Sequence, residues 1–231
     1  MRSWCWRWGL GGTLDSTNVI DAPECAVITA LGMDHVKELG PTLADIAAAK
    51  AGIIKEECPV VSYGGVPEAD IVIRRVCAEK HAELTEVDFS RLKYEGGSLD
   101  AVEFDFDGLT DVHLPLIGSY QPRNAALAIT ALRVMRTHGW NIPENAIRTG
   151  LETVSWPGRF ELLRHAPAFL LDGSHNAHGM RATVQSLRDR FPRAEVRFSG
   201  QHHGRQGCGP DAQPAGTAGG AVRHGGGAHA A

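Results

Sequence analysis

The segment AVITALGMDH, residues 26–35, decides the fold class of this chain. It opens with a short, largely apolar run containing β-branched residues, which is typical of a buried strand, and it ends in polar residues. Short runs of this kind alternate with helical stretches through most of the sequence, and this alternation predicts an α/β fold with crossover helices. In such folds, polar residues that follow a strand lie at the ligand-binding edge of the sheet.

The sequence on either side of residues 26–35 supports this prediction. Thr42 and Asp45 have the spacing of a capping box and open an alanine-rich helix. Residues 102–106 and 112–114 alternate apolar and polar positions around Asp107-Gly108, which predicts an antiparallel hairpin. The expected strands are 26–30, 59–63, 102–106, 112–114, 168–172 and one beginning at 195, and the expected helices are 43 to about 54, 67–81, 122–138, 143–151 and 179–190.

The segment SWPGR, residues 155–159, interrupts this alternation. We therefore expect an α/β domain with a mostly parallel sheet over residues 9–154, and the start of a second, Rossmann-like α/β domain over residues 155–199. Both ends of the chain differ from this middle: tryptophan is concentrated in residues 4–8, and residues 200–231 are rich in glycine. Because such a tail cannot form a core, we expect it to be disordered.

Composition argues against several classes of protein. The formal net charge of −4 over 231 residues argues against nucleic-acid binding, which normally needs a basic surface. No apolar run reaches the ~18 residues that a membrane helix requires. The five cysteines are widely spaced and form no Cys-x-x-Cys pair, so neither a disulfide framework nor a thiolate zinc site is suggested. We expect a cytoplasmic monomer that acts on small molecules.

Three polar residues in the first predicted domain are candidates for a ligand site. His35 could bind a metal through one ring nitrogen, or it could be a loop histidine without a ligand. Lys50 lies among small residues of its helix and, taken alone, is best interpreted as a solvated lysine. Asn124 lies at the start of a helix, where backbone N–H groups and the helix dipole favour phosphate, although it could equally be only a cap or a first-turn residue.

Arg159 and the segment DGSHN, residues 172–176, form a further candidate group. A guanidinium offers planar paired donors for phosphate oxygens. Asp172 and His175 place a carboxylate and an imidazole at the end of a predicted strand, which suits a nucleotide site between two domains. The same pattern also fits a tight turn whose aspartate caps the next helix, and the sequence does not decide between these interpretations.

Six segments, taken in order, carry a resemblance to a known family. They are GLGGTLDSTNVI (9–20), ITALGMDH (28–35), LGPTLADIA (39–47), KAGIIK (50–55), WPGR (156–159) and DGSHN (172–176). Together they resemble the signatures of the folylpolyglutamate synthase/dihydrofolate synthase family of the Mur ligase superfamily, over about residues 9–199. Each segment alone is modest evidence, but the ordered set indicates common ancestry.

The resemblance implies an incomplete Mur-ligase-type ATPase domain and an ATP-dependent ligase that joins L-glutamate to a folate or to dihydropteroate through an acyl phosphate. Magnesium suits this chemistry because it bridges phosphate oxygens. By position, His35 resembles the family's magnesium-binding histidine, and Lys50 resembles the lysine that the family carbamylates and that would then also hold the metal. The other implied roles are ATP contacts for Asn124, Arg159 and Asp172, catalysis by Lys50 and His175, and pterin binding by the loop of Asp15, Ser16, Thr17 and Asn18.

The sequence also departs from this family. It contains no G-x-x-G-K-[ST] phosphate-binding loop, and Arg7 stands where the family has an acidic magnesium ligand. Codons for residues 3–9, read two bases later, can encode Leu-Val-Leu-Glu-Val-Gly, and those for 205–207, read one base later, can encode Asp-Lys-Asp. We therefore hypothesise that residues 1–8 and about 200–231 are translated out of frame around a genuine ligase fragment.

Two functional hypotheses of different class follow. The first is a folate–glutamate ligase, and the second is a non-catalytic remnant without the phosphate-binding loop and the acidic ligand; a cell-wall Mur ligase is a weaker third. For the chain as written we expect no measurable ligase activity. The choice between dihydropteroate and tetrahydrofolate stays open. We also expect a single cleft to collect His35, Lys50, Asn124, Arg159 and Asp172, because they would share ATP and Mg²⁺.

Overall fold

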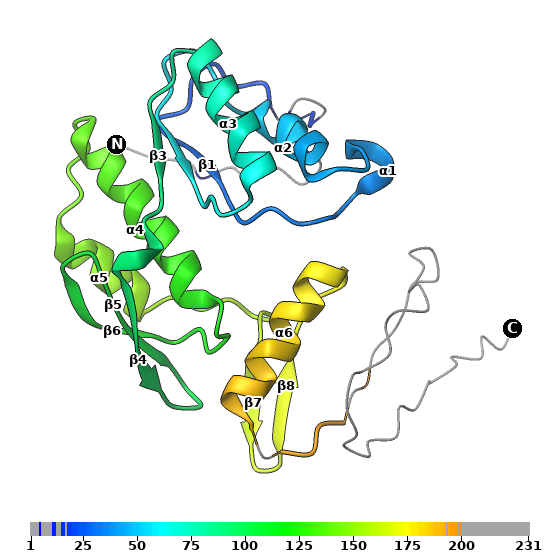
Figure 1. Ribbon diagram of the computed structural model, residues 1–231. Helices are drawn as coiled ribbons and strands as arrows, with labels where there is room; N and C mark the ends of the chain where they lie inside the picture. The colour runs from blue at the N-terminus through cyan, green and yellow to red at the C-terminus, as the bar shows by residue number, and fades with distance from the viewer. Residues whose placement is uncertain are drawn as a thin grey trace, which may run out of the picture. The chain divides into compact units, whose positions relative to one another are not determined.

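A parallel sheet of three strands contains the segment that decides the fold class (Figure 1). Its strands, in order across the sheet, are β1 (Ala26–Ile28), β2 (Val60–Ser62) and β3 (Leu84–Glu86). The segments between them carry α1 (Val36–Leu39), α2 (Leu43–Ala51) and α3 (Pro67–Glu79). The predicted α/β arrangement with a parallel sheet is confirmed, whereas β3 and α1 are not among the predicted elements.

The computed structural model describes residues 5, 11–12, 15–16, 18–192, 194–197 and 199. Residues up to Arg190 fall into one compact unit and those from Phe191 onward into another. The expected domain division at residues 154–155 stays a prediction. Arg7, Thr17 and most of the two terminal segments hypothesised to be out of frame lie outside the described residues. None of the described helices is long and apolar enough to cross a membrane.

Helix α2 begins with the predicted capping box. The Thr42 hydroxyl accepts a hydrogen bond from the Asp45 N–H, and the Asp45 carboxylate accepts one from the Thr42 N–H, each at 3.1 Å. The helix ends at Ala51 rather than near residue 54. From Gly52 onward the backbone N–H groups bond to carbonyls only three residues back, so the chain tightens out of the α-helical geometry.

The predicted hairpin around Asp107-Gly108 is confirmed within an antiparallel sheet. The sheet consists of β4 (Leu92–Gly97), β5 (Val102–Phe106) and β6 (Leu109–Leu114), in sequence order. Both turn residues have positive φ, 47° at Asp107 and 84° at Gly108, as a two-residue hairpin loop of this twist requires. Strand β4 is not among the predicted elements.

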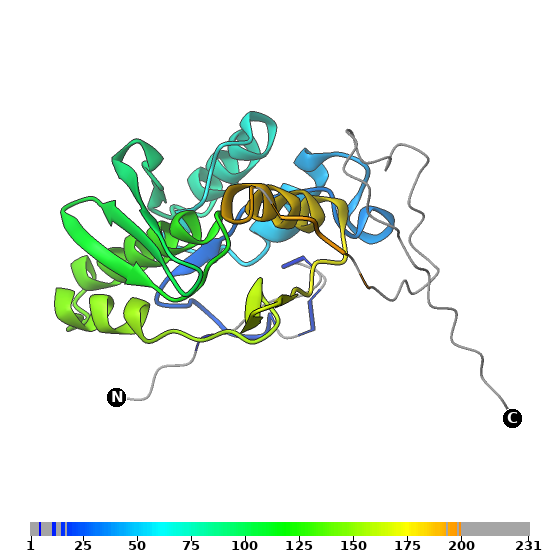
Figure 2. The same ribbon diagram turned by 90° about the horizontal axis from the view of Figure 1, so that it is seen from below.

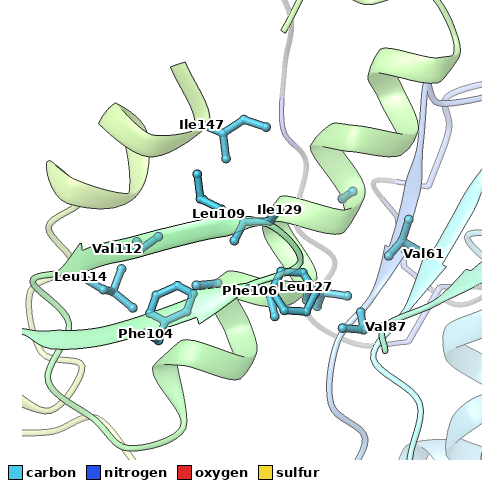
Figure 3. Close-up of a cluster of buried hydrophobic side chains, with 13 residues drawn as sticks. Val61, Val87, Phe104, Phe106, Leu109, Val112, Leu114, Leu127, Ile129 and Ile147 are labelled. Atoms are coloured by element: carbon cyan, nitrogen blue, oxygen red, sulfur yellow. The ribbon is translucent and has the colours of Figure 1, made fainter. Parts of the chain in front are cut away.

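The main hydrophobic core joins the two sheets through helix α4 (Gln121–Thr137), with α5 (Glu144–Glu152) packed beside it. Figure 3 shows side chains of the antiparallel sheet, such as Phe104 and Val112, in one cluster with Ile129 of α4. Val61 of β2 and Val87 after β3 extend this cluster to the parallel sheet. Helix α4 is thereby fixed against both sheets, and its first turn carries Asn124.

The C-terminal part of the first unit is a hairpin followed by a helix. Strands β7 (Glu161–His165) and β8 (Ala168–Leu171) pair antiparallel, and α6 (Ala177–Arg190) lies on one side of them (Figure 2). The strand predicted at 168–172 is therefore present, but its partner is the unpredicted β7. The strand predicted to begin at Glu195 is wrong: the described residues 194–197 and 199 form none, because no neighbouring strand pairs with them.

Candidate functional site

The loop after β1 places His35 at the carboxyl edge of the parallel sheet. His35 caps the N-terminus of α1 in the left-handed region, with φ 49°, which is uncommon for a residue other than glycine. Its N–H donates to Asp34 Oδ1 at 2.9 Å, and its Nε2 lies 3.9 Å from Asp34 Oδ2. The side chain of His35 is 38% exposed, so the imidazole is accessible to a ligand.

A hydrogen bond joins this loop to the DGSHN segment. Asn176 Nδ2 donates to Asp34 Oδ2 at 2.7 Å, and Asn176 Oδ1 accepts the Gly179 N–H at 2.8 Å, which caps the first turn of α6. Gly32 lies against the His178 ring so closely that a Cβ on Gly32 would be 2.6 Å from its Cγ. Two loops far apart in the sequence therefore meet at this edge.

Asp172 is held by three donors. Its Oδ1 accepts the Ser174 N–H at 3.0 Å and the Thr183 hydroxyl at 2.8 Å, and its Oδ2 accepts the Phe160 N–H at 2.8 Å. Burial alone would raise the pKa of the Asp172 carboxyl, but the hydrogen bonds from Ser174, Thr183 and Phe160 outweigh it and keep the pKa below its ordinary value. Asp172 thus anchors its turn as a carboxylate, while the cap of α6 comes from Asn176.

Arg159 lies next to this anchored turn. The residue after it, Phe160, is fully buried with a positive φ of 51°, and its N–H is the one bound by Asp172. Burial raises the pKa of Tyr120, the negative charge of Asp172 raises it further, and Arg159 opposes this rise. The charges of Asp172 and Arg159 therefore both act on the pKa of Tyr120, which lies at the start of α4.

Ser119, which lies just before the N-cap of α4, is hydrogen-bonded to α6. The Ser119 N–H donates to Ser186 Oγ at 3.0 Å, and the two hydroxyls are also 3.0 Å apart. Asn124 is exposed, and its Nδ2 donates to Gln121 Oε1 at 3.0 Å. This places the start of α4 close to the helix that carries Thr183. The Gln121 N–H donates to the Gly118 carbonyl at 2.9 Å and the Asn124 N–H to the Tyr120 carbonyl at 3.3 Å. Asn124 does not cap α4 itself, because its side chain bonds to another side chain.

The remaining predicted residues lie around α2. Lys50 is half-buried in its last turn, and in the described part of the chain no hydrogen bond or ion pair joins Lys50 to His35, Arg159 or Asp172. Asn18 donates to the carbonyls of Gly12 at 3.0 Å and Gly52 at 2.9 Å, so its amide holds the N-terminal segment against the end of α2.

Asp15 and Ser16 also belong to this N-terminal segment. The Asp15 N–H donates to the Gly12 carbonyl at 3.3 Å, and the Asn18 N–H donates to the Asp15 carbonyl at 3.0 Å, so the segment turns back on itself. Ser16, within that turn, is exposed. The pterin-binding role expected for this loop stays a prediction.

His175 is exposed, and its Nδ1 lies 3.0 Å from the Gly173 carbonyl oxygen. Because a carbonyl only accepts, Nδ1 is the donor in this contact, and in a neutral ring Nε2 is then the acceptor nitrogen. Among the described residues, the structure thus relates His35 to Asn176, and Arg159 to Asp172 and Tyr120. It does not connect Lys50 to either of these groups, and the convergence of His35, Lys50, Asn124, Arg159 and Asp172 expected from the sequence stays a prediction.

Comparison with known proteins decides the family. Over 195 residues the chain is 38% identical to the dihydrofolate synthase/folylpolyglutamate synthase of Bacillus subtilis, a match that covers 81% of this chain. The chain belongs to the folylpolyglutamate synthase/dihydrofolate synthase family. It spans 45% of the length of the Bacillus protein, and no protein-family model matches it.

Solved structures of the same family share the fold. A folylpolyglutamate synthase (FPGS) in an "FPGS-AMPPCP-folate complex" is similar with a TM-score of 0.74 and 33% identity, over 82% of this chain and 47% of that one. A Mycobacterium tuberculosis folylpolyglutamate synthase complexed with ADP is similar with a TM-score of 0.70 and 34% identity, over 80% of this chain and 42% of that one. The family predicted from the six sequence segments is thereby confirmed.

Several residues that build the site are not among those predicted from the sequence. Asp34 and Asn176 lie inside quoted family segments, but their mutual contact spans 142 positions, which no local pattern reveals. Thr183 lies 11 residues after Asp172 and reaches back to it only because α6 folds over the hairpin. Tyr120 precedes the predicted helix start by two positions, and its place next to two opposite charges depends on tertiary packing.

Proposed function

We propose that this chain is part of an ATP-dependent ligase that joins L-glutamate to a folate or to dihydropteroate. The observation that carries the proposal is the meeting of the His35 loop with the DGSHN loop through Asp34 and Asn176. The fold in which they meet is shared with family members whose structures are named as complexes with AMPPCP, folate or ADP. A nucleotide and an acceptor carboxylate would react between these loops.

Arg159 and the start of α4 are the proposed nucleotide contacts. A guanidinium binds phosphate oxygens through paired donors, and the first N–H groups of a helix attract negative charge. Asn124 is exposed in that first turn and offers an amide for a nucleobase or a phosphate. Asp172 acts in this proposal chiefly through Phe160, because its hydrogen bond fixes the backbone next to Arg159.

Magnesium is proposed to bind at His35. The described residues contain no group of three His, Cys, Asp or Glu side chains that could hold a metal. Mg²⁺ usually binds proteins through only one or two side chains, most often carboxylates, and completes its shell with phosphates and water. The His35 imidazole would be such a single protein ligand, and phosphates and water would supply the remaining oxygens. Lys50 would add a carbamate oxygen if it is carbamylated. The ion would supply positive charge to neutralise the phosphate oxygens.

The chain's own residues would prepare the reacting groups. Arg159 would hold the phosphates in place, so the acceptor carboxylate meets them in a fixed orientation. In its neutral form His175 can accept a proton at Nε2, for example from the ammonium of glutamate. The segment from Asp15 to Asn18 would contact the pterin. We propose a monomer located in the cytoplasm.

A chimeric enzyme tests this proposal. The matched part of the Bacillus relative is replaced by residues 9–199 of this chain, and ADP release is measured with and without L-glutamate and each folate substrate. We expect ADP release that requires both glutamate and tetrahydrofolate or dihydropteroate. Arg159→Ala should lower the rate about 10²-fold or more, since it removes one preorganised electrostatic contact.

Arg164→Ala is the matched control. Arg164 is exposed on β7 and, among the residues that the structure describes, donates only to the Pro167 carbonyl, so its loss should leave the rate unchanged. A folded chimera that releases no ADP, or releases it without glutamate and folate, contradicts the proposal. The 231-residue chain by itself is expected to show no turnover, and robust turnover would overturn that expectation while supporting the ligase.

A further inference from the structure

All four polar side-chain atoms of Asp34 and Asn176 form hydrogen bonds, either with each other or with the backbone of their own loops. Asp34 Oδ1 accepts the His35 N–H at 2.9 Å, and Asp34 Oδ2 accepts Asn176 Nδ2 at 2.7 Å. Asn176 Oδ1 accepts the Gly179 N–H at 2.8 Å. Each side chain therefore orders its own loop with one atom and the opposite loop with another.

The hydrogen bond between Asp34 and Asn176 lies next to the two candidate histidines, His35 and His175. Asp34 immediately precedes His35 and fixes the backbone that sets the direction of the imidazole. Asn176 immediately follows His175 and begins α6, which carries Thr183, a donor to Asp172. Both side chains are partly buried, and a hydrogen bond to a charged group in such a place is stronger than one between neutral groups.

We propose that Asp34 and Asn176 are positioning residues that couple the two loops of the ligase site through their hydrogen bond. Neither residue is given a contact with substrate: Asp34 acts on His35, and Asn176 acts on His175 and the start of α6. The role of this coupling in catalysis rests on the proposed function. The coupling of the two loops does not, because it follows from the hydrogen bond alone. Disturbing one loop at Asp34 should therefore loosen the other loop, which lies 142 positions away.

Exchanging the two side chains provides the test, because the exchange preserves the full set of bonds. In Asn176→Asp two carboxylates face each other, which breaks the bridge. In Asp34→Asn the amide has only one acceptor oxygen for the His35 N–H and Asn176 Nδ2, so the bridge is either lost or reduced to a bond between neutral groups. In the double variant Asn at 34 still accepts the His35 N–H and donates to Asp at 176, which still accepts the Gly179 N–H. A purely local role would make the two single effects additive, whereas coupling makes the double variant recover.

Hydrogen exchange of the 231-residue chain is the first measurement. Asp34→Asn should accelerate exchange of the Ser174 and Gly179 amides about tenfold, as expected when a hydrogen bond to a charged group is lost. The double variant should restore the protection. Asp100→Asn makes the same chemical change at the exposed pair of Asp100 with His165, 2.8 Å apart, and should leave both amides unchanged.

If Asn176→Asp does not fold, Asn176→Ser replaces it. Serine retains a cap for the Gly179 N–H but is too short to reach Asp34, so it should accelerate exchange at the His35 amide. Unchanged exchange at Ser174 and Gly179 in Asp34→Asn, or a double variant as loose as the single variants, overturns the proposal.

Calorimetric titration with ADP on the same proteins tests the catalytic meaning. Each single variant should weaken ADP binding about tenfold and the double variant should restore it, while Asp107→Asn, at the turn between β5 and β6, should bind as the unchanged chain does. If exchange follows the pattern but the unchanged chain binds no ADP, the coupling stands and the proposed function fails. If ADP binds with equal affinity to all variants, the positioning role is wrong.

Discussion

Replacing Asp172 by asparagine tests whether its carboxylate anchors the turn next to Arg159. The carboxylate accepts three hydrogen bonds, from the N–H groups of Ser174 and Phe160 and from the Thr183 hydroxyl, at 2.8–3.0 Å. An asparagine of the same shape can accept on one side only, so its NH₂ group would face a donor whichever way it turned. At least one bond to a charged acceptor is lost.

The expected cost is about 1.5 kcal/mol, the lower end for a hydrogen bond to a charged group, because Asp172 is only partly buried. For a folding unit of this size that corresponds to a fall in Tm of about 3–6 °C. Thr183→Val removes one donor to the same oxygen, whereas the control Thr183→Ser keeps the hydroxyl. The effects of Asp172→Asn and Thr183→Val should be less than additive, since both remove one bond.

Urea unfolding at several pH values is the assay. The folded pKa of Asp172 lies below its ordinary value because its three donors outweigh the effect of burial, so the carboxylate stabilises the fold above the unfolded pKa of about 4. As the pH falls through the folded pKa, this contribution is lost, and the difference between the unchanged chain and Asp172→Asn should shrink. Equal stability of the two proteins at pH 7, or a difference that grows in acid, would refute the reasoning.

Three further predictions concern the helix start, the core and the cysteines. Thr42→Ala removes the cap that binds the Asp45 N–H and should cost about 1 kcal/mol in urea unfolding; no change would contradict the role of the capping box. Phe104→Ala empties a fully buried position in the cluster of Figure 3 and should cost about 3–5 kcal/mol, which a cost below about 1 kcal/mol would contradict. Burial raises the pKa of Cys25 to about 11, so alkylation at pH 8, followed by peptide mapping, should modify the exposed Cys5 more than about tenfold faster; equal rates would contradict this assignment.

Local chemistry made part of the fold predictable from the sequence. The capping box of Thr42 and Asp45 and the turn at Asp107-Gly108 depend on residues within a few positions of each other, and both are confirmed. Strand β7 is less visible, because its residues do not alternate cleanly and it has exposed positions on both faces. The strand expected from Glu195 fails for a related reason, since an apolar pattern forms a strand only where a partner strand is available.

In the candidate site, too, the sequence predicts individual residues but not their tertiary contacts. Family segments point to His35, Arg159 and Asp172, but they do not say what each side chain touches. The donors to Asp172 include Phe160, which precedes β7, and Thr183, which lies in α6. Its anchoring role therefore follows only from tertiary structure. The bridge from Asp34 to Asn176 needs two loops to meet, and no spacing rule predicts that meeting.

A crystal structure of the 231-residue chain grown with a saturating concentration of ADP tests the central claim most directly. We predict that the nucleotide lies between Arg159 and the start of α4, with its phosphates bound by the Arg159 guanidinium and its base or ribose within hydrogen-bonding distance of Asn124. A nucleotide bound away from both residues, or no nucleotide in a crystal whose site is open to solvent, would contradict the assignment of this chain to the nucleotide-binding part of a folate–glutamate ligase.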